Sequence, residues 1–160
     1  RALLEDDTPT FRPARGTDAK ALTALAQRSK GHWGYPEAWM EAWQAALTFH
    51  PGQMTSQYAV LVAADGQLLG FYGLESGEGG WQLEHCWVDP QSMGSGHGRR
   101  LVEHALAVVR GLGANTLTVE SDPSAMGFYE RLGAKHVCDV ARPVCGEHRH
   151  LPILKWMLSD

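Results

Sequence analysis

A glycine-rich stretch before a long apolar-periodic run is the first feature of this sequence that could do chemistry. In VDPQSMGSGHGRRL, residues 88–101, glycines alternate with other residues and two arginines follow at once. Glycine permits left-handed backbone geometry and close approach of a ligand, and a helix presents unpaired N–H groups at its positive end. The stretch is therefore either an anion-binding loop or a flexible turn with a solvated basic helix start. Its residues are Gly94, Gly96 and Gly98, followed by Arg99 and Arg100.

A carboxylate precedes this loop on an alternating segment. WQLEHCWV, residues 81–88, has the period of a half-buried β-strand. The alternation predicts one face with Gln82, Glu84, Cys86 and Val88, and the other with Trp81, Leu83, His85 and Trp87. Glu84 is a candidate general base. The alternative is a strand glutamate exposed to solvent.

Two further stretches carry reactive or ligand-binding side chains. DPSAMGFYERLGA, residues 122–134, predicts a short helix with Asp122 as its N-cap. Tyr129 in this helix is either a proton donor or a packing residue beside Phe128. GHWGYPEAW, residues 31–39, is rich in aromatics, and an aromatic wall can hold a cationic amine. The alternative for the second stretch is a hydrophobic contact between two helices.

The elements that position these residues follow from their periodicity. We predict helices over residues 17–31, 36–47, 98–113 and 122–134. We predict strands over 11–15, a hairpin over 58–75 turning at Asp65-Gly66, and strands over 81–88, 115–121, 134–140 and 151–158, the last two joined by a polar loop. The order β-α-α-β-β-β-α-β-α-β-β predicts an α+β fold, a three-layer α/β sandwich around a mixed, mostly antiparallel sheet.

Composition restricts the class of protein. The 160 residues fit a single domain over 1–160, and the net charge of −4 argues against a nucleic-acid partner. The apolar runs are too short to span a membrane. The start RALLEDDTPT lacks a signal-peptide pattern and a Met, which suggests a trimmed chain. Three cysteines without a framework predict a cytoplasmic protein. Cys145, His148 and His150 lack the second ligand pair of a zinc site, so we expect no metal.

Two motifs have the order and spacing of a known family. Gln91, Gly94 and Gly96 match a loop of the form Gln/Arg-x-x-Gly-x-Gly/Ala. A second motif, Asn-x-x-Ala-x-x-(apolar)-Tyr before a Gly-Phe-like pair, is matched by Asp122, Ala125, Phe128 and Tyr129 and then by Gly133-Ala134. Together with the order of elements, they resemble the GNAT superfamily of acyl-CoA-dependent N-acyltransferases. Met93, His97 and Asp122 depart from residues common in that family.

The resemblance implies a role for each candidate residue. The backbone of residues 94–98 would bind the pyrophosphate of acetyl-CoA. Glu84 would be the general base, with Glu75 and His85 as alternatives, and Tyr129 would protonate the leaving thiolate. The implied cofactor contacts are Cys86, Trp87, Val88 (whose N–H would polarise the acyl carbonyl), Gln91, Met93, Gly94, Ser95, Gly96, His97, Gly98, Arg99, Asp122, Ser124, Phe128 and Tyr129. The acceptor contacts would be Trp33, Tyr35, Glu75 and Glu84.

The expected activity is transfer of an acetyl group from acetyl-CoA to a primary amine by direct attack in a ternary complex. The aromatic residues 31–39 would narrow an open groove, which favours a small-molecule acceptor. Two alternatives stay open: a protein or peptide N-acetyltransferase, and a non-enzymatic module that binds or senses acyl-CoA. The sequence leaves open the acceptor, the acyl chain length and the oligomeric state. Residues 151–158 could pair as an edge strand in a homodimer.

Overall fold

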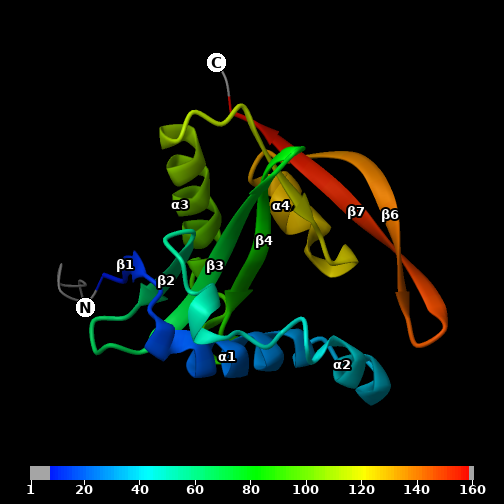
Figure 1. Cartoon of the computed structure of the whole chain (residues 1–160), viewed down its shortest axis with the longest axis horizontal. Helices are drawn as coiled ribbons and strands as arrows, with labels where there is room; N and C mark the ends of the chain where they lie inside the picture. The colour runs from blue at the N-terminus through cyan, green and yellow to red at the C-terminus, as the bar shows by residue number, and fades with distance from the viewer. Residues whose placement is uncertain (1–7, 159–160) are drawn as a thin grey trace. The chain divides into compact units, whose positions relative to one another are not determined.

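The computed structural model describes residues 8–158, so the charged residues 1–7 of the supposedly trimmed start lie outside the described part. The chain divides into two compact units. The first comprises Arg1–Gly73 and His85–Val102, and the second comprises Leu74–Glu84 and Glu103–Asp160. Strands β3 (Leu68–Gly77) and β4 (Gly80–Val88) and helix α3 (His97–Gly111) each contribute to both units. Figure 1 labels these three elements along the chain. A single domain over residues 1–160 stays a prediction.

The first unit begins with strand β1 (Thr10–Pro13), helix α1 (Ala19–Gly31), helix α2 (Glu37–Trp43) and strand β2 (Tyr58–Val62). β2 pairs antiparallel with β1 and with β3. α1 is amphipathic, and its buried face contributes Leu22, Leu25 and Ala26 to a core that also contains Phe49 and Phe71. Burial of these apolar side chains is the main force that fixes α1 in this unit.

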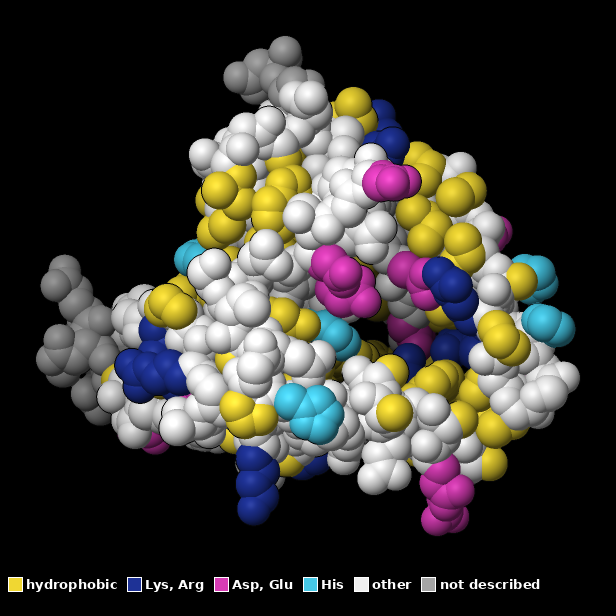
Figure 2. Space-filling view, in the orientation of Figure 1, with side chains coloured by type: hydrophobic (Ala, Val, Ile, Leu, Met, Phe, Trp, Pro, Cys, Tyr) yellow, Lys and Arg dark blue, Asp and Glu magenta, His cyan; other side chains and the backbone are white. Residues whose placement is uncertain are grey.

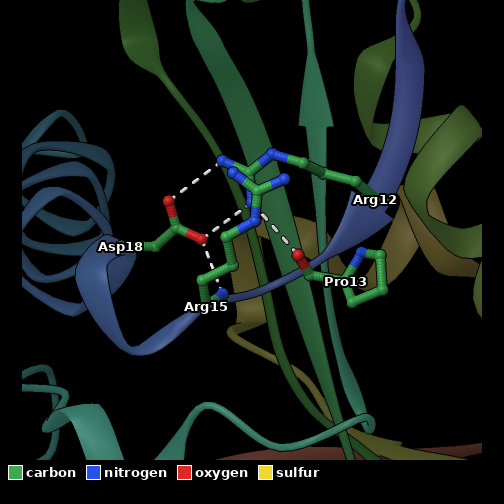
Figure 3. Close-up of polar contacts among 4 residues, drawn as sticks. All are labelled: Arg12, Pro13, Arg15 and Asp18. Atoms are coloured by element: carbon green, nitrogen blue, oxygen red, sulfur yellow. Dashed lines mark hydrogen bonds and ion pairs between the residues drawn. The ribbon is translucent and has the colours of Figure 1, made fainter.

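An ion pair connects β1 to the start of α1 (Figure 3). The Arg12 guanidinium donates from Nη1 and Nη2 to the two carboxylate oxygens of Asp18, at 2.8 and 3.0 Å. Asp18 also accepts the backbone N–H of Arg15 at 2.7 Å. The hydrogen bond from Arg12 and the one from Arg15 lower the pKa of Asp18, against the effect of burial. This forked contact orients the chain where it leaves the strand and enters the helix.

The second unit contains strand β5 (Thr116–Glu120), helix α4 (Met126–Arg131), strand β6 (Lys135–Val144) and strand β7 (Glu147–Met157). β4 and β5 run parallel and pair at Trp81 and Gln82. β7 lies between β5 and β6, antiparallel to both. The buried side chains of this unit come from alternate positions of its strands. They include Leu83, Leu117, Val119, Leu154 and Trp156.

The strand order is β1-β2-β3-β4-β5-β7-β6. The predicted α+β fold with a mixed, mostly antiparallel sheet is confirmed, and so is the order of helices and strands. The predicted stop of α3 is also confirmed, because Gly113 has φ +83° and the Ala114 N–H bonds back to the Val109 carbonyl.

Three predictions about elements are wrong. The helix predicted over 36–47 ends at Trp43, and Pro36 precedes it as the N-cap. The polar loop predicted before residue 151 is a continuous hairpin that turns at Cys145 and Gly146, with φ +47° and +81°. β6 and the part of β7 before residue 151 are mostly exposed, so they lack the apolar alternation that marks a half-buried strand. Residues 151–158 are therefore not an edge: β7 is paired on both sides, and β6 is the outer strand.

Among residues 8–158, no helix has the length and apolar character needed to cross a membrane. Over the same range, no three His, Cys, Asp or Glu side chains gather in a way that could hold a metal ion.

Candidate active site

The glycine-rich loop lies in the first unit, between the end of β4 and the start of α3. Gly94 and Gly96 have φ angles of +86° and +80°, which residues with a Cβ rarely adopt. A Cβ added at either position would meet no other atom within 4 Å, so the space beside both residues is open. α3 begins at His97, and the N–H groups of a first helical turn face outward at the positive end of the dipole. The loop therefore has the geometry of an anion site.

A buried carboxylate that the sequence analysis did not single out fixes the start of this loop. Asp89 accepts the backbone N–H of Gln91 at 3.1 Å and the guanidinium of Arg28 on α1 at 2.9 Å. Its own N–H bonds to the Leu69 carbonyl at 2.9 Å. The Asp-Pro pair directly after a strand could have predicted the local cap. The pairing with Arg28, 61 residues earlier, has no signal in the sequence.

The first turn of α3 contains a second contact with the loop. Arg100 Nη1 lies 3.1 Å from Nδ1 of the buried His97 and donates to the Ser95 carbonyl at 3.3 Å. Burial, and then the charge of Arg100, lower the pKa of His97. His97 is therefore neutral near pH 7, and Arg100 holds the loop backbone. Arg99 is exposed in the same turn and stays the predicted anion contact.

The end of β4 holds the alternative base, His85. Its ring packs against Phe49 with centroids 4.8 Å apart, and its Nδ1 accepts the indole N–H of Trp87 at 3.2 Å. His85 and Trp87 therefore share a face, as predicted. Burial lowers the pKa of His85 to about 4. A histidine with this pKa accepts a proton poorly at neutral pH, which argues against a role as the base.

A polar hollow of about 480 Å³ lies in the second unit, beside the parallel pair β4 and β5. Gln82 pairs with Thr118, and two residues further along each strand Glu84 and Glu120 both line the hollow. Figure 2 shows acidic side chains beside Lys or Arg side chains on this hollowed face. The full lining is Gln82, Leu83, Glu84, Thr118, Glu120, Arg142 and Ile153.

The charges in this hollow act on Glu84. Arg142 forms a forked pair with Glu120, with Nε 3.1 Å from both carboxylate oxygens. Glu84 is exposed at its strand position, and partial desolvation in the hollow raises its pKa, as do the charges of Glu75 and Glu120, while Arg142 opposes them. A carboxylate with a raised pKa is a stronger base than an ordinary one. Glu84 is thus suited to accept a proton, and Glu75 acts on it through its charge. The sequence analysis did not identify Glu120 or Arg142 as part of the site. Arg142 lies between residues 140 and 151, which were predicted to be joined by a loop.

Helix α4 carries the second predicted motif in the second unit. Asp122 caps the turn before α4, because its carboxylate accepts the N–H and the hydroxyl of Ser124 at 3.0 and 2.7 Å. Asp122 therefore caps the 3₁₀ turn Pro123–Ala125, whereas α4 itself begins only at Met126, with Ala125 as its N-cap. Tyr129 is 7% exposed, and its ring contacts Phe128 and Trp156 at centroid distances of 5.1 and 5.7 Å. These rings fix the orientation of Tyr129, whether or not its hydroxyl reacts.

The two aromatic residues predicted as an acceptor wall separate in the first unit. Trp33 is 52% exposed and touches the ring of His32. Tyr35 instead contacts Trp39 and Trp43 of α2, with centroids 5.9 and 5.1 Å away. The structure thus does not bring Trp33 and Tyr35 together as one wall. The partners of Tyr35 follow it at intervals of four residues, a signal that the sequence contained.

Comparisons with known proteins agree with this arrangement. The profile of the acetyltransferase (GNAT) family matches residues 19–134. A peptidyl-lysine N-acetyltransferase, YjaB, from Salmonella typhimurium is 36% identical over 69 residues, which are 40% of this chain and 46% of that protein. The chain is thus matched to less than half the length of this relative.

Solved structures share the fold over nearly the whole chain. A GCN5-related N-acetyltransferase from Rhodopseudomonas palustris has a TM-score of 0.79 at 22% identity, covering 98% of this chain and all of that one. The PaiA N-acetyltransferase from Thermoplasma acidophilum, solved with coenzyme A, has a TM-score of 0.76 at 16% identity and covers 94% of this chain and 99% of that one. Because the family profile covers most of the chain and the fold agrees, this chain belongs to the acetyltransferase (GNAT) family of N-acetyltransferases.

Proposed function

We propose that this chain transfers the acetyl group of acetyl-CoA to a primary amine of a small cationic molecule, by direct attack in a ternary complex. The observation that carries the proposal is Glu84, a carboxylate with a raised pKa in a polar hollow. Glu84 and Glu120 face one arginine there, Arg142, and Glu75 adds a further negative charge. This excess of negative charge favours an acceptor that arrives as an ammonium ion.

The loop over residues 91–98 fits the diphosphate of the cosubstrate. The open space at Gly94 and Gly96 would admit the phosphate oxygens, and the first N–H groups of α3 would donate to them. Bound acetyl-CoA supplies the thioester that the amine attacks. Arg99, in the first turn, adds a charge-assisted contact.

The chain's own groups would then move two protons. Glu84 accepts a proton from the acceptor ammonium, directly or through a water, which frees the nitrogen lone pair. The Val88 N–H donates to the carbonyl oxygen as it gains negative charge. The freed lone pair forms the N–C bond as the C–S bond breaks. The Tyr129 hydroxyl gives its proton to the departing thiolate, and the surplus proton on the newly acylated nitrogen passes through water to restore that hydroxyl. Each step depends on one predicted residue, so each proposed role can be tested separately.

The test is an assay of CoA thiol release with acetyl-CoA and a panel of amines: linear diamines, an aminoglycoside, free amino acids and a lysine-containing peptide. We expect turnover with at least one cationic amine and much less turnover in Glu84→Gln. Tight binding of acetyl-CoA without turnover on any amine would replace this proposal with the acyl-CoA sensing module.

A peptide acceptor is the second candidate. The observation that favours it is the 36% identity over 69 residues to a protein named as a peptidyl-lysine N-acetyltransferase. Lysine is itself a primary alkylamine, so the same hollow and the same base would serve. The peptide member of the panel decides between the two candidates.

Tyr129→Phe tests the proposed acid. The ring contacts with Phe128 and Trp156 do not need the hydroxyl, so we expect the fold to stay unchanged and acetyl-CoA still to bind. We expect kcat to fall by about 100-fold or more, the order of a lost general acid. Stopped-flow thiol release measures this change. If kcat stays within about twofold of the wild type, Tyr129 only packs.

Arg142→Gln tests the electrostatics of the hollow. The charge of Arg142 lowers the pKa of Glu84 and neutralises Glu120, so its removal raises the pKa of Glu84. Glu84 acts as a base only when ionised. The acidic limb of the kcat–pH profile should therefore move to higher pH. Arg110→Gln, the same change at an exposed site on α3, should leave the limb in place, and equal profiles for both variants would contradict the prediction.

A further inference from the structure

The guanidinium of Arg142 in the hollow uses only part of its hydrogen-bonding capacity. Nε lies 3.1 Å from both carboxylate oxygens of Glu120, and Nη2 donates to Oε1. Among residues 8–158, Nη1 has no hydrogen-bond acceptor, so the edge formed by Nη1 and Nη2 keeps donors for a ligand. The Arg142 side chain is 56% exposed, so a ligand in solution can reach it. The two parallel donors of such an edge match the two oxygens of a carboxylate.

The contact with Glu120 fixes the direction of this free edge. Arg142 lies on the outer strand β6 and Glu120 on β5, with β7 between them. β7 pairs with both strands, and an exposed ion pair adds little to their stability. The forked contact does, however, hold the plane of the guanidinium. Little side-chain entropy is therefore lost when a ligand binds to the free edge.

Two carboxylates of the same unit have no hydrogen-bond or ion-pair partner among the described residues. One is Glu84, which lines the hollow. The other is Glu75, in the exposed part of β3. The charges of Glu75 and Arg142 both act on Glu84, in opposite directions. Together these groups present two unpaired negative charges and one unused guanidinium edge.

We infer that the acceptor is a diamino acid such as lysine or ornithine, and that Arg142 binds its carboxylate through the free edge of the guanidinium. One ammonium group would face Glu84, which accepts its proton, and the other would lie near Glu75. Each charge of the ligand then meets an opposite charge of the protein. The bonds formed and broken in the acetyl transfer are the same for any primary amine. The inference rests on the proposed function, to which it adds a substrate class and a specificity-determining residue.

The carboxylate separates this class of acceptor from the others that could supply an ammonium group. A linear diamine has no anionic group for the free edge of Arg142. A lysine inside a peptide has its carboxyl group bound in an amide, which carries no charge and has one oxygen. Lysine and 1,5-diaminopentane therefore form a matched pair of probes, because they differ only in the carboxylate.

Steady-state kinetics with this pair test the role of Arg142. In the wild type, KM for lysine should be about 10-fold lower than KM for 1,5-diaminopentane, the order of one charge-assisted contact. Arg142→Gln should raise KM for lysine by about 10-fold and should leave KM for the diamine unchanged or lower. Both are measured on the plateau above the acidic limb, where Glu84 is ionised in every variant. Arg110→Gln, the control at an exposed site on α3, should keep the wild-type preference.

Arg142→Lys separates the forked edge from the charge alone. The new side chain keeps the positive charge but has no pair of parallel donors. The acidic limb of the kcat–pH profile should therefore stay near its wild-type position, while most of the preference for lysine over 1,5-diaminopentane is lost. A purely electrostatic role of Arg142 would keep both the limb and the preference, and that result would overturn the inference. This variant also preserves the test if Arg142→Gln misfolds.

Binding is measured without turnover by calorimetric titration in saturating CoA, which has no acetyl group to transfer. The probes are again lysine and 1,5-diaminopentane. We expect the wild type to bind lysine with a Kd about 10-fold lower than that for the diamine, and Arg142→Gln to remove the difference. Equal Kd values for the two probes in the wild type, or a preference that survives in Arg142→Gln, would contradict the inference.

These outcomes distinguish the inference from the proposed function. If lysine binds in preference to the diamine and depends on Arg142, but no amine is acetylated, the proposed function fails and the carboxylate subsite stands. If amines are acetylated without a preference for the one that carries a carboxylate, the proposed function stands and the inference fails. A peptide with an internal lysine as the best substrate gives the second of these results.

Discussion

Glu84→Gln should lower kcat by about 10²- to 10³-fold, the order expected for a lost general base. Gln keeps the size and polarity of the side chain but cannot accept a proton from an ammonium ion. The Kd for acetyl-CoA should stay unchanged, because the glycine loop does not include Glu84. Thiol release at saturating acetyl-CoA and amine measures kcat, and calorimetric titration measures the Kd.

The pH dependence follows from the same residue. Partial desolvation and the charges of Glu75 and Glu120 raise the pKa of Glu84, and the base form exists only above that pKa. Wild-type kcat should therefore fall as the pH drops through the raised pKa, and this limb should disappear in Glu84→Gln. An acidic limb that survives the substitution would assign it to another group, and Glu84 would not be the base.

The thermal stability of Glu84→Gln should stay the same or rise, although its kcat falls. A carboxyl whose pKa is raised on folding stabilises the native state below its unfolded pKa and loses that contribution as the pH rises through the folded one. At neutral pH the ionised Glu84 is thus unfavourable to folding. Glu84→Gln should hold or raise Tm while kcat falls. Glu78→Gln, the same change in the exposed β3–β4 turn, should alter neither quantity, and a lower Tm in Glu84→Gln would point to misfolding.

The fold could be predicted because its signals are local. The Asp65-Gly66 turn marks the hairpin of β2 and β3, and Gly66 has the left-handed φ of +91° that such a turn needs. Asp122 caps the turn before α4, and Gly113 ends α3, as their residue types indicate. The inner parts of β6 and β7 were predicted as strands, but the outer half of their hairpin was missed because it is mostly exposed. No periodic apolar pattern marks such a strand.

The candidate site could be predicted only in part, because only some of its residues lie in local sequence motifs. Glu84 and the glycines lie in contiguous motifs with a fixed spacing. Arg142 reaches Glu120 across 22 residues, and Arg28 reaches Asp89 across 61. These partners depend on strand pairing and helix packing, which no local pattern encodes. Arg142 and Glu120 shift the pKa of Glu84, and Asp89 fixes the start of the loop. The missed residues therefore act on the residues that we propose for the chemistry.

Gly96→Glu should raise the Kd for acetyl-CoA by about 100-fold or more. Gly96 has φ +80° and open space where a Cβ would stand, so a new side chain would project toward the place where we expect the phosphates. A carboxylate there repels the diphosphate, and the strained backbone turns N–H donors away. The loss of two charge-assisted hydrogen bonds at about 1.5–3 kcal/mol each accounts for a change of this size. Calorimetric titration with acetyl-CoA measures it.

Gly66→Glu separates ligand exclusion from backbone strain. Gly66 also has a left-handed φ, +91°, and open space around its Cβ position, but it lies in the β2–β3 turn. Both variants should lose a similar 1–2 kcal/mol or so of stability to backbone strain, which chemical denaturation measures. Only Gly96→Glu should lose acetyl-CoA. If the two variants bind acetyl-CoA equally well, residues 94–98 form a turn and the diphosphate binds elsewhere.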